Sequence, residues 1–149
     1  MDFSKITVAV IGLGLMGGSF AMRLKELGAA VIGINRTLST AEAVLRQGIV
    51  DSIDISDLKH ADIVIFCTPA KATLAFVKDH LPDFRSDAIM TDIAGVKLVG
   101  QLRHLAKQFV QGRALLIIQL ALDADLKTGH LQAAGLLVDL HGAATAIAG

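Results

Sequence analysis

The fold of this chain is decided by two adjacent stretches: residues 6–11, which read ITVAVI, and residues 12–17, which read GLGLMG. A short β-branched run of this kind is typical of a strand that is buried on both faces of a parallel sheet. After the glycines, apolar side chains recur at helical spacing as far as Leu27, and Gly28 supplies a stop signal. The sequence therefore predicts a strand over the first stretch and a helix over residues 15–27.

Further strands and helices alternate along the chain. The spacing of Ser39 and Glu42 matches a capping box, in which the two residues satisfy each other's backbone amides at the start of a helix. The pattern predicts strands at residues 30–34, around 53, 62–67, 88–91 and 114–118, and helices at residues 39–47, 70–80 and 96–109. This alternation indicates an α/β fold, a Rossmann-type doubly wound parallel sheet with helices on both faces. Such sheets bind ligands at the carboxyl ends of their strands.

Composition excludes several classes of protein. The chain has 149 residues, of which 53% are hydrophobic and 19% charged, so it can bury a core and is not disordered. Fourteen basic and fourteen acidic residues give no net charge, which argues against nucleic acid or a membrane surface as a partner. With Cys67 as its single cysteine, the chain has no internal disulfide and no cysteine-based metal cluster, and we expect no bound metal.

The uncharged stretch over residues 6–22 resembles a signal peptide only superficially. Asp2 precedes it where basic residues are expected, and glycines interrupt it. No apolar run approaches the roughly 18 residues that span a bilayer. We therefore expect a soluble, cytoplasmic protein.

The character of the sequence changes at Arg113. Of the 37 residues from there to the end, 22 are Ala, Leu or Gly. We therefore expect a nucleotide-binding domain over residues 1–112 and an Ala/Leu/Gly-rich tail over residues 113–149, from a truncated gene or a shifted reading frame. The alternative is a genuine short variant whose tail helices cap the sheet. An exposed apolar tail also predicts self-association, as in a homo-oligomer.

The glycine motif indicates a dinucleotide site because it follows a predicted strand and opens a predicted helix. In that setting Gly12 permits the tight turn, Gly14 lets the backbone approach a pyrophosphate, and Gly17 allows close packing of helix and strand. Leu15 and Met16 would then offer their amides to the phosphates at the helix N-terminus. Two alternatives stay open: a glycine-rich turn without a ligand, and a methyltransferase that uses S-adenosylmethionine.

The end of the second predicted strand bears on the choice of cofactor. An acidic residue normally meets the ribose hydroxyls of NAD there, whereas this sequence has Asn35, Arg36 and Thr37. The change removes a carboxylate that would repel a 2′-phosphate and adds a guanidinium that can bind one. The sequence favours NADP over NAD. Alternatively, Arg36 is solvated or stacks on the adenine, as happens in proteins that use NAD.

Longer motifs give the chain a resemblance to a known family. Gly18-Ser19 follows the glycine motif, CTPA occupies residues 67–70, and TDIAGVK occupies residues 91–97. In this order, over roughly residues 5–110, the chain resembles the prephenate/arogenate dehydrogenases of tyrosine biosynthesis. The resemblance implies an NAD(P)-dependent oxidoreductase that acts on a small molecule, prephenate or arogenate, by hydride transfer with decarboxylation.

The resemblance also implies roles for particular residues. Thr68 and Pro69 would line the cofactor near its pyrophosphate and ribose, and Asp92 and Lys97 would border the nicotinamide. On the simpler alternatives, Thr68 and Pro69 only end a strand and Asp92 caps a helix. Cys67 is expected to be a core residue rather than a nucleophile.

The sequence departs from the family in two places. Gly95 stands where the family has a serine, and residues 114–121 read ALLIIQLA where it has a histidine-containing Gly-Gly-His-Pro-Met-Ala-Gly segment. The catalytic residue is therefore unassigned, and His60, His80 and His104 are expected on the surface. Two alternatives to an active dehydrogenase follow: a non-catalytic NADP-binding module or subunit, and an NADP-dependent reductase of a small imine or keto acid.

Overall fold

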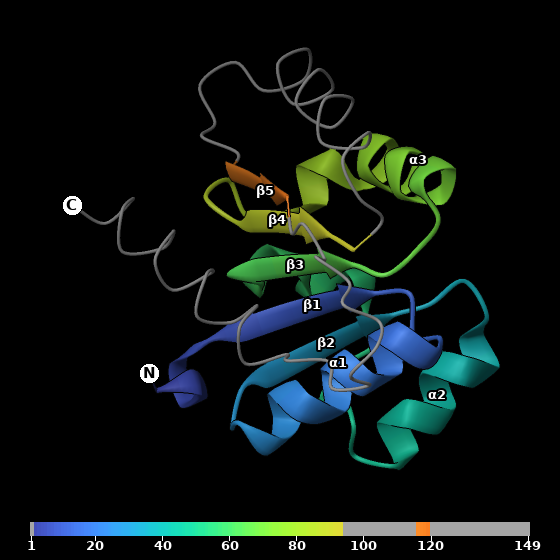
Figure 1. Cartoon of the computed structure of the whole chain (residues 1–149), viewed down its shortest axis with the longest axis vertical. Coiled ribbons are helices and arrows are strands. Elements are labelled where there is room, and N and C mark those ends of the chain that lie inside the picture. Colours follow the sequence, from blue (N-terminus) through green and yellow to red (C-terminus); the bar gives the residue numbers. More distant parts are fainter. Residues whose placement is uncertain (1, 94–115, 120–149) are drawn as a thin grey trace, which may run out of the picture.

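The computed structural model describes residues 2–93 and 116–119. Its elements are η1 (Phe3–Lys5), β1 (Thr7–Ile11), α1 (Leu15–Glu26), β2 (Ala30–Ile34), α2 (Leu38–Arg46), η2 (Ile55–His60), β3 (Ile63–Phe66), α3 (Ala70–His80), η3 (Leu81–Asp83), β4 (Ile89–Asp92) and β5 (Leu116–Gln119), where η marks a 3₁₀ helix. The strands form one five-stranded sheet in the order β2-β1-β3-β4-β5, shown in Figure 1. Every strand pair is parallel, as the sequence predicts.

The sheet is doubly wound. From β1 the chain moves outward to β2, and it then returns to place β3 on the other side of β1. Connections between parallel strands are right-handed, so the two directions of winding place helices on opposite faces. The strand order therefore reverses between β1 and β3, the position at which such sheets bind ligands.

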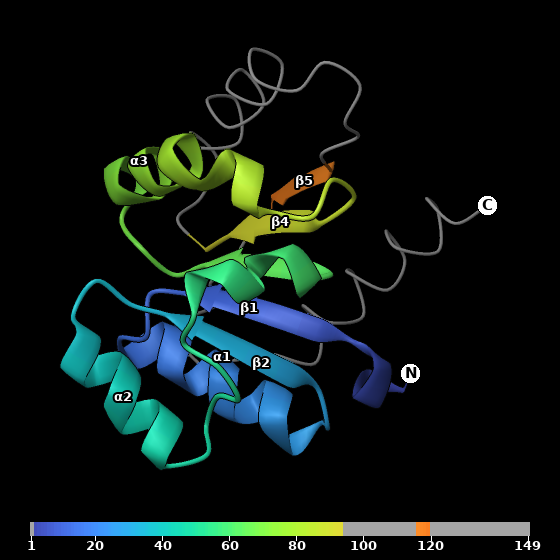
Figure 2. The same cartoon turned by 180° about the vertical axis from the view of Figure 1, so that it is seen from behind.

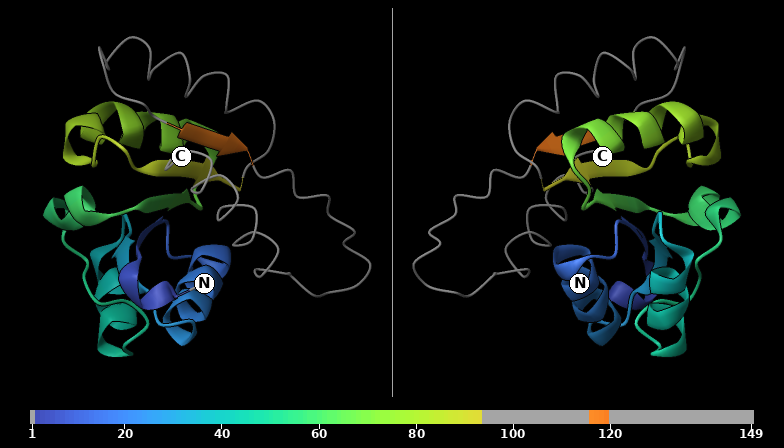
Figure 3. Two further views of the ribbon diagram at one scale, coloured as in Figure 1. Left: turned by 90° about the vertical axis from the view of Figure 1, so that its left-hand side faces the viewer. Right: turned by 90° about the vertical axis from the view of Figure 1, so that its right-hand side faces the viewer.

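Helices cover both faces of the sheet, as expected. Val8 and Val10 of β1 belong to the same apolar cluster as Leu24 of α1. The alternate residues Ala9 and Ile11 belong to the other cluster, which holds Leu58 of η2 and Val77 of α3. Figure 1 shows α1 in front of the sheet, whereas the reverse view in Figure 2 brings η2 to the front. The edge-on views in Figure 3 separate α1 from η2 across the sheet.

The predicted stop of the first helix at Gly28 is confirmed. Gly28 has a φ of +92°, a left-handed conformation that favours glycine. The amide of Ala29 donates to the carbonyl of Leu24 over 3.0 Å, which closes a Schellman motif. The helix therefore ends at Glu26, and Gly28 lies two residues before the start of β2.

The predicted capping box is wrong. The N-cap of α2 is Thr37, and Ser39 lies inside the first turn of the helix. The carbonyl of Thr37 accepts the amides of Thr40 and Ala41, and the side chain of Asn35 also donates to it over 3.1 Å. These bonds start the helix two residues earlier than the motif predicts.

The strand expected around Ile53 is also wrong. In its place Ser52 forms a single parallel bridge with Ile32. The Ser52 hydroxyl then accepts the amide of Asp54 over 3.1 Å, which turns the chain into η2 before a strand can extend. Among the described residues, the β2 edge of the sheet therefore gains this single bridge in place of a strand.

The later part of the chain is described only in part. The strand predicted at residues 114–118 is found as β5, which begins two residues later and ends one residue later than predicted. It follows the expected domain boundary at residue 112, which stays a prediction. The helix predicted at residues 96–109 and the rest of the tail lie outside the described residues. No helix among the described residues is long and apolar enough to cross a membrane.

Candidate functional site

Four strands end at the same level of the sheet. Ile11 is paired with Ile34 and Phe66, and Phe66 is paired with Asp92. The segments that follow β1, β2 and β3 therefore emerge together at one edge, which we call the carboxyl edge. This register brings the turn of residues 12–14 between β1 and α1, which we call the glycine turn, close to the candidate residues that follow β2 and β3.

Two glycines of the motif leave no room for a side chain, Gly12 in the turn between β1 and α1 and Gly17 in the first turn of α1. Gly12 has a φ of +94°, and a Cβ there would lie 2.7 Å from Cγ2 of Thr68. A Cβ on Gly17 would lie 1.7 Å from the carbonyl oxygen of Gly12. Gly14 differs, since a Cβ there would meet no protein atom within 4 Å. The space beside Gly14 is open, as close approach of a ligand to the backbone requires.

The N-terminus of α1 leaves backbone amides unpaired among the described residues. Gly14 provides no side-chain cap, and the first turn contains no acidic residue. The first amide with a helical acceptor is that of Gly18, which donates to the carbonyl of Gly14 over 2.8 Å. The amides of Leu15, Met16 and Gly17 have no acceptor among the described residues. Unpaired amides at the positive end of a helix dipole form an anion site.

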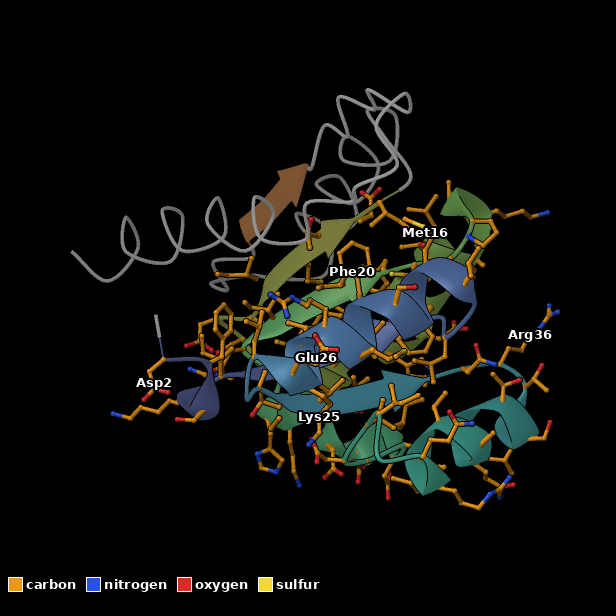
Figure 4. All side chains as sticks on the ribbon, turned by 60° about the horizontal axis from the view of Figure 1, so that its bottom comes forward. Asp2, Met16, Phe20, Lys25, Glu26 and Arg36 are labelled. Carbon is orange, nitrogen blue, oxygen red and sulfur yellow. The ribbon has the colours of Figure 1, made fainter. Side chains whose placement is uncertain are left out.

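The residues that follow β2 fall into two groups. The side chain of Asn35 is bonded on both sides: Oδ1 accepts the amide of Leu13 over 3.0 Å, and Nδ2 donates to the carbonyl of Thr37. The side chain of Arg36 is exposed and forms no ion pair with any described residue. Figure 4 shows Arg36 and Met16 toward one end of the molecule, with Asp2 at the other.

The residues that follow β3 lie against the glycine turn. The carbonyl of Cys67 is also close to Gly12, 2.8 Å from a Cβ placed there. The hydroxyl of Thr68 lies 2.7 Å from that of the buried Thr73, and Pro69 is the N-cap of α3. Sequence analysis missed Thr73, although a threonine in the first turn of a helix commonly bonds back to the preceding turn.

Asp92 is the last residue of β4 and is buried. Beside it, the hydroxyl of Thr91 is buried without a hydrogen-bond partner among the described residues. Lys97 and Gly95 lie outside the described residues, as does the helix that Asp92 was alternatively expected to cap.

The surroundings of Cys67, His60 and His80 bear on the roles that the sequence predicts for them. Burial raises the pKa of the Cys67 thiol to about 12, so the thiol stays protonated at neutral pH and is not a nucleophile. His60 is exposed, and His80 is half-buried beside Phe76 and 2.9 Å from Asp83. No cluster of three or more metal-ligating side chains occurs among the described residues.

Gly33 is a second residue that sequence analysis missed. A Cβ on Gly33 would lie 2.8 Å from Val50 and 3.0 Å from the side chain of Leu13. Gly33 thus leaves the room in which Leu13, the second residue of the glycine turn, is buried. A glycine inside a strand pattern was the available signal, because it often marks a close approach.

Comparisons with known proteins agree with this geometry. The family model described as the nucleotide-binding domain of prephenate dehydrogenase matches residues 20–117. Prephenate dehydrogenase of Bacillus subtilis is 33% identical over 103 residues, which cover 65% of this chain and 28% of that protein. The crystal structure of Synechocystis arogenate dehydrogenase matches with a TM-score of 0.62 and 33% identity, over 70% of this chain and 38% of the other.

A structure of prephenate dehydrogenase from A. aeolicus, in complex with hydroxyphenyl propionate and NAD+, matches with a TM-score of 0.60. Its identity is 27%, over 67% of this chain and 38% of the other. The chain thus spans between 28% and 38% of the length of these relatives.

The sheet and its carboxyl edge define the class of protein, a Rossmann-type nucleotide-binding domain of the NAD(P)-dependent dehydrogenases. The chain belongs to the family of prephenate dehydrogenase nucleotide-binding domains. The family expected from the sequence motifs is thereby confirmed. The match begins at residue 20, inside α1, so the role of the glycine turn is argued from its own geometry.

Proposed function

We propose that the carboxyl edge of the sheet binds NADP, with NAD as the alternative, on behalf of a prephenate/arogenate-type dehydrogenase. The observation that carries the proposal is the bare N-terminus of α1, whose amides at Leu15, Met16 and Gly17 have no acceptor among the described residues. Such a helix start attracts an anion. The open space beside Gly14 fits the same ligand.

The neighbouring segments fit the rest of a dinucleotide. Thr68 lies against Gly12, and Pro69 follows it as the N-cap of α3, so the two residues would line the pyrophosphate and ribose. The turn after β2 carries Arg36, whose guanidinium would bind a 2′-phosphate in two places at once. Thr37 would adjoin the same phosphate. The absence of a carboxylate from residues 35–37 supports NADP over NAD.

The bound nicotinamide would supply a hydride acceptor for the substrate's alcohol carbon, in a reaction coupled to decarboxylation. The protein's part is to hold the cofactor and to orient a small substrate, prephenate or arogenate. Asp92, at the end of β4, and Lys97 are proposed for the nicotinamide end. The relatives named as prephenate and arogenate dehydrogenases support this reaction. The general base is not assigned.

Titration with NADPH and NADH tests the binding proposal. We expect NADPH to bind more tightly to the wild-type chain. Arg36→Ala should weaken NADPH binding about tenfold, roughly the value of one charge-assisted contact, and change NADH binding less than about twofold. The matched control is Arg46→Ala, which removes an exposed arginine from the last turn of α2 and should change neither. If the chain binds neither nucleotide, the proposal fails, and equal binding of both favours NAD.

Turnover is tested separately, by following the absorbance of the reduced nicotinamide with prephenate or arogenate. Production of NADPH or NADH supports a dehydrogenase within this chain. Tight binding without turnover of either substrate favours the non-catalytic NADP-binding module.

A further inference from the structure

We propose that Asn35 is a positioning residue that couples the glycine turn to the turn that carries Arg36, and so sets the preference for nucleotides with a 2′-phosphate. The inference rests on the nucleotide-binding function proposed above. It differs from the sequence-based role of Asn35, in which the residue merely lacks the charge that would repel that phosphate.

The acceptor side of the Asn35 carboxamide holds the glycine turn. Its Oδ1 accepts the amide of Leu13 over 3.0 Å. The side chain of Leu13 is buried in the space left by Gly33, and the adjacent amide of Gly12 donates to the carbonyl of Ile34 over 2.8 Å. Leu13 is therefore fixed through both its backbone and its side chain. This bond holds the turn that is proposed to bind the pyrophosphate. Since NADP and NAD both have a pyrophosphate, its loss should weaken binding of both.

The donor side holds the other turn. Nδ2 of Asn35 donates over 3.1 Å to the carbonyl of Thr37, which also accepts the first amides of α2. Arg36 lies between the two residues joined by this bond. Since the Arg36 side chain forms no ion pair with a described residue, its placement depends on the backbone of this turn. The second bond therefore bears on the 2′-phosphate alone.

Both bonds together require a carboxamide. An aspartate at position 35 could accept from Leu13, but its second oxygen would face the Thr37 carbonyl, and two acceptors repel each other. An alanine would make neither bond. Asn35 stands where an acidic residue normally meets the ribose of NAD, and its carboxamide makes a bond to the Thr37 carbonyl that a carboxylate cannot make.

A double-mutant cycle on nucleotide preference tests the coupling. The dissociation constants of NADPH and NADH are measured for wild type, Asn35→Ala, Arg36→Ala and the double variant. We expect Asn35→Ala to weaken binding of both nucleotides and, without adding any charge, to lower the preference for NADPH at least threefold. In that background Arg36→Ala should change the preference at least threefold less than it does in wild type. If the two effects on preference simply multiply, Asn35 does not position Arg36 and the inference is overturned.

Two further variants separate positioning from stability. Asn35→Asp keeps the bond to Leu13, so we expect NADH affinity within threefold of wild type and loss of the NADPH preference. Retention of that preference would overturn the inference even if Asn35→Ala failed to fold. The matched control is Asp51→Ala. Asp51 accepts the amide of Val31 near the start of β2, at the end of the sheet remote from the glycine turn, so its loss should leave both affinities unchanged.

The outcome also distinguishes the two proposals. If wild type binds neither nucleotide, the proposed function fails and the role of Asn35 with it. If wild type prefers NADPH and the cycle is additive, the function stands and only the positioning role is wrong.

Discussion

The two edges of the sheet are built in opposite ways. The amino edge, where the strands begin, has all five ion pairs of the described residues: Arg23–Glu26, Lys25–Asp51, His80–Asp83, Arg85–Asp62 and Arg85–Asp87. The carboxyl edge, within the same residues, has no ion pair, and α1, α2 and α3 begin there without a side-chain cap. Figure 4 places Lys25 and Glu26 away from Met16 and Arg36.

Helix dipoles give this difference a physical meaning. Basic residues occupy the last turns of α1, α2 and α3, where they stabilise the negative ends of the dipoles. No acidic residue occupies their first turns, so the positive ends remain uncompensated. The amino edge therefore pairs its charged groups within the protein, whereas the carboxyl edge leaves the amides of Leu15, Met16 and Gly17 unpaired among the described residues, available to the nucleotide proposed above. Stability and binding should accordingly respond to different mutations.

The largest effect is expected from Gly17→Ala, which should lower both the free energy of unfolding and the affinity for NADPH. The added Cβ would lie 1.7 Å from the carbonyl oxygen of Gly12, so the helix or the turn must move. We expect a loss of about 3 kcal/mol in the free energy of unfolding, at the upper end for overpacking, together with loss of NADPH binding. Denaturant unfolding measures the first effect.

The control is Gly18→Ala, one residue along the same helix. Its Cβ would meet only the Leu13 carbonyl oxygen, at an ordinary 3.8 Å. Replacing a helical glycine by alanine should then raise stability by about 0.5–1 kcal/mol. Equal stabilities for the two variants would contradict the close approach at Gly17.

Gly14→Ala should affect binding alone. Its Cβ would meet no protein atom within 4 Å, so we expect unfolding to change by less than about 1 kcal/mol. The methyl group would occupy the space proposed for the pyrophosphate, and NADPH binding should weaken more than about tenfold. Titration with NADPH checks this expectation. A variant that binds NADPH as tightly as wild type would place the phosphates elsewhere.

Asp62→Ala should affect stability alone. Oδ2 of Asp62 accepts the amide of Thr7 over 2.9 Å, and Oδ1 accepts from Arg85. Loss of the acceptor leaves a part-buried amide unpaired, which should lower the free energy of unfolding by about 1–2 kcal/mol. NADPH affinity should not change. Asp62→Asn can keep the bond to Thr7, and because exposed ion pairs contribute little, it should cost less than about 1 kcal/mol.

The sequence predicted the fold because its local signals agreed. The β-branched strand before the glycines, the helix that ends at Gly28 and the helix from Ala70 to His80 all appear where their patterns place them. The first residues of α2 were missed because Asn35 bonds to the Thr37 carbonyl, and a side-chain bond of this kind leaves no periodic pattern.

The candidate site was predictable in its parts rather than in its connections. The glycines and the residues after β2 and β3 follow from position alone, since parallel strands end at one edge. That Gly33 makes room for Leu13, and that Asn35 joins two turns, depends on the alignment of β1 with β2. Neither contact can be predicted before the alignment of these two strands is known.

The smallest expected effect is a pH dependence of the free energy of unfolding that arises at the amino edge, from Asp51. Partial burial raises the pKa of Asp51, but hydrogen bonds from Lys25 and from the Val31 amide, with the charge of Lys25, outweigh it, so the pKa lies below its ordinary value of 3.8. A carboxyl with a lowered pKa stabilises the fold above that ordinary value, and the contribution is lost as the pH falls through the lowered pKa. With about half of the side chain exposed, solvent screening should keep the contribution below about 1 kcal/mol.

Asp51→Asn should therefore lose less stability than wild type as the pH is lowered from about 5 to 3, in denaturant unfolding at each pH. Asp79→Asn is the control for the loss of one exposed carboxylate, since Asp79 of α3 forms no ion pair among the described residues. Because Asp51 lies at the edge without the glycine turn, NADPH affinity at neutral pH should be the same in all three proteins. Parallel slopes for wild type and Asp51→Asn would mean that the Lys25–Asp51 ion pair contributes nothing measurable to the stability of the amino edge.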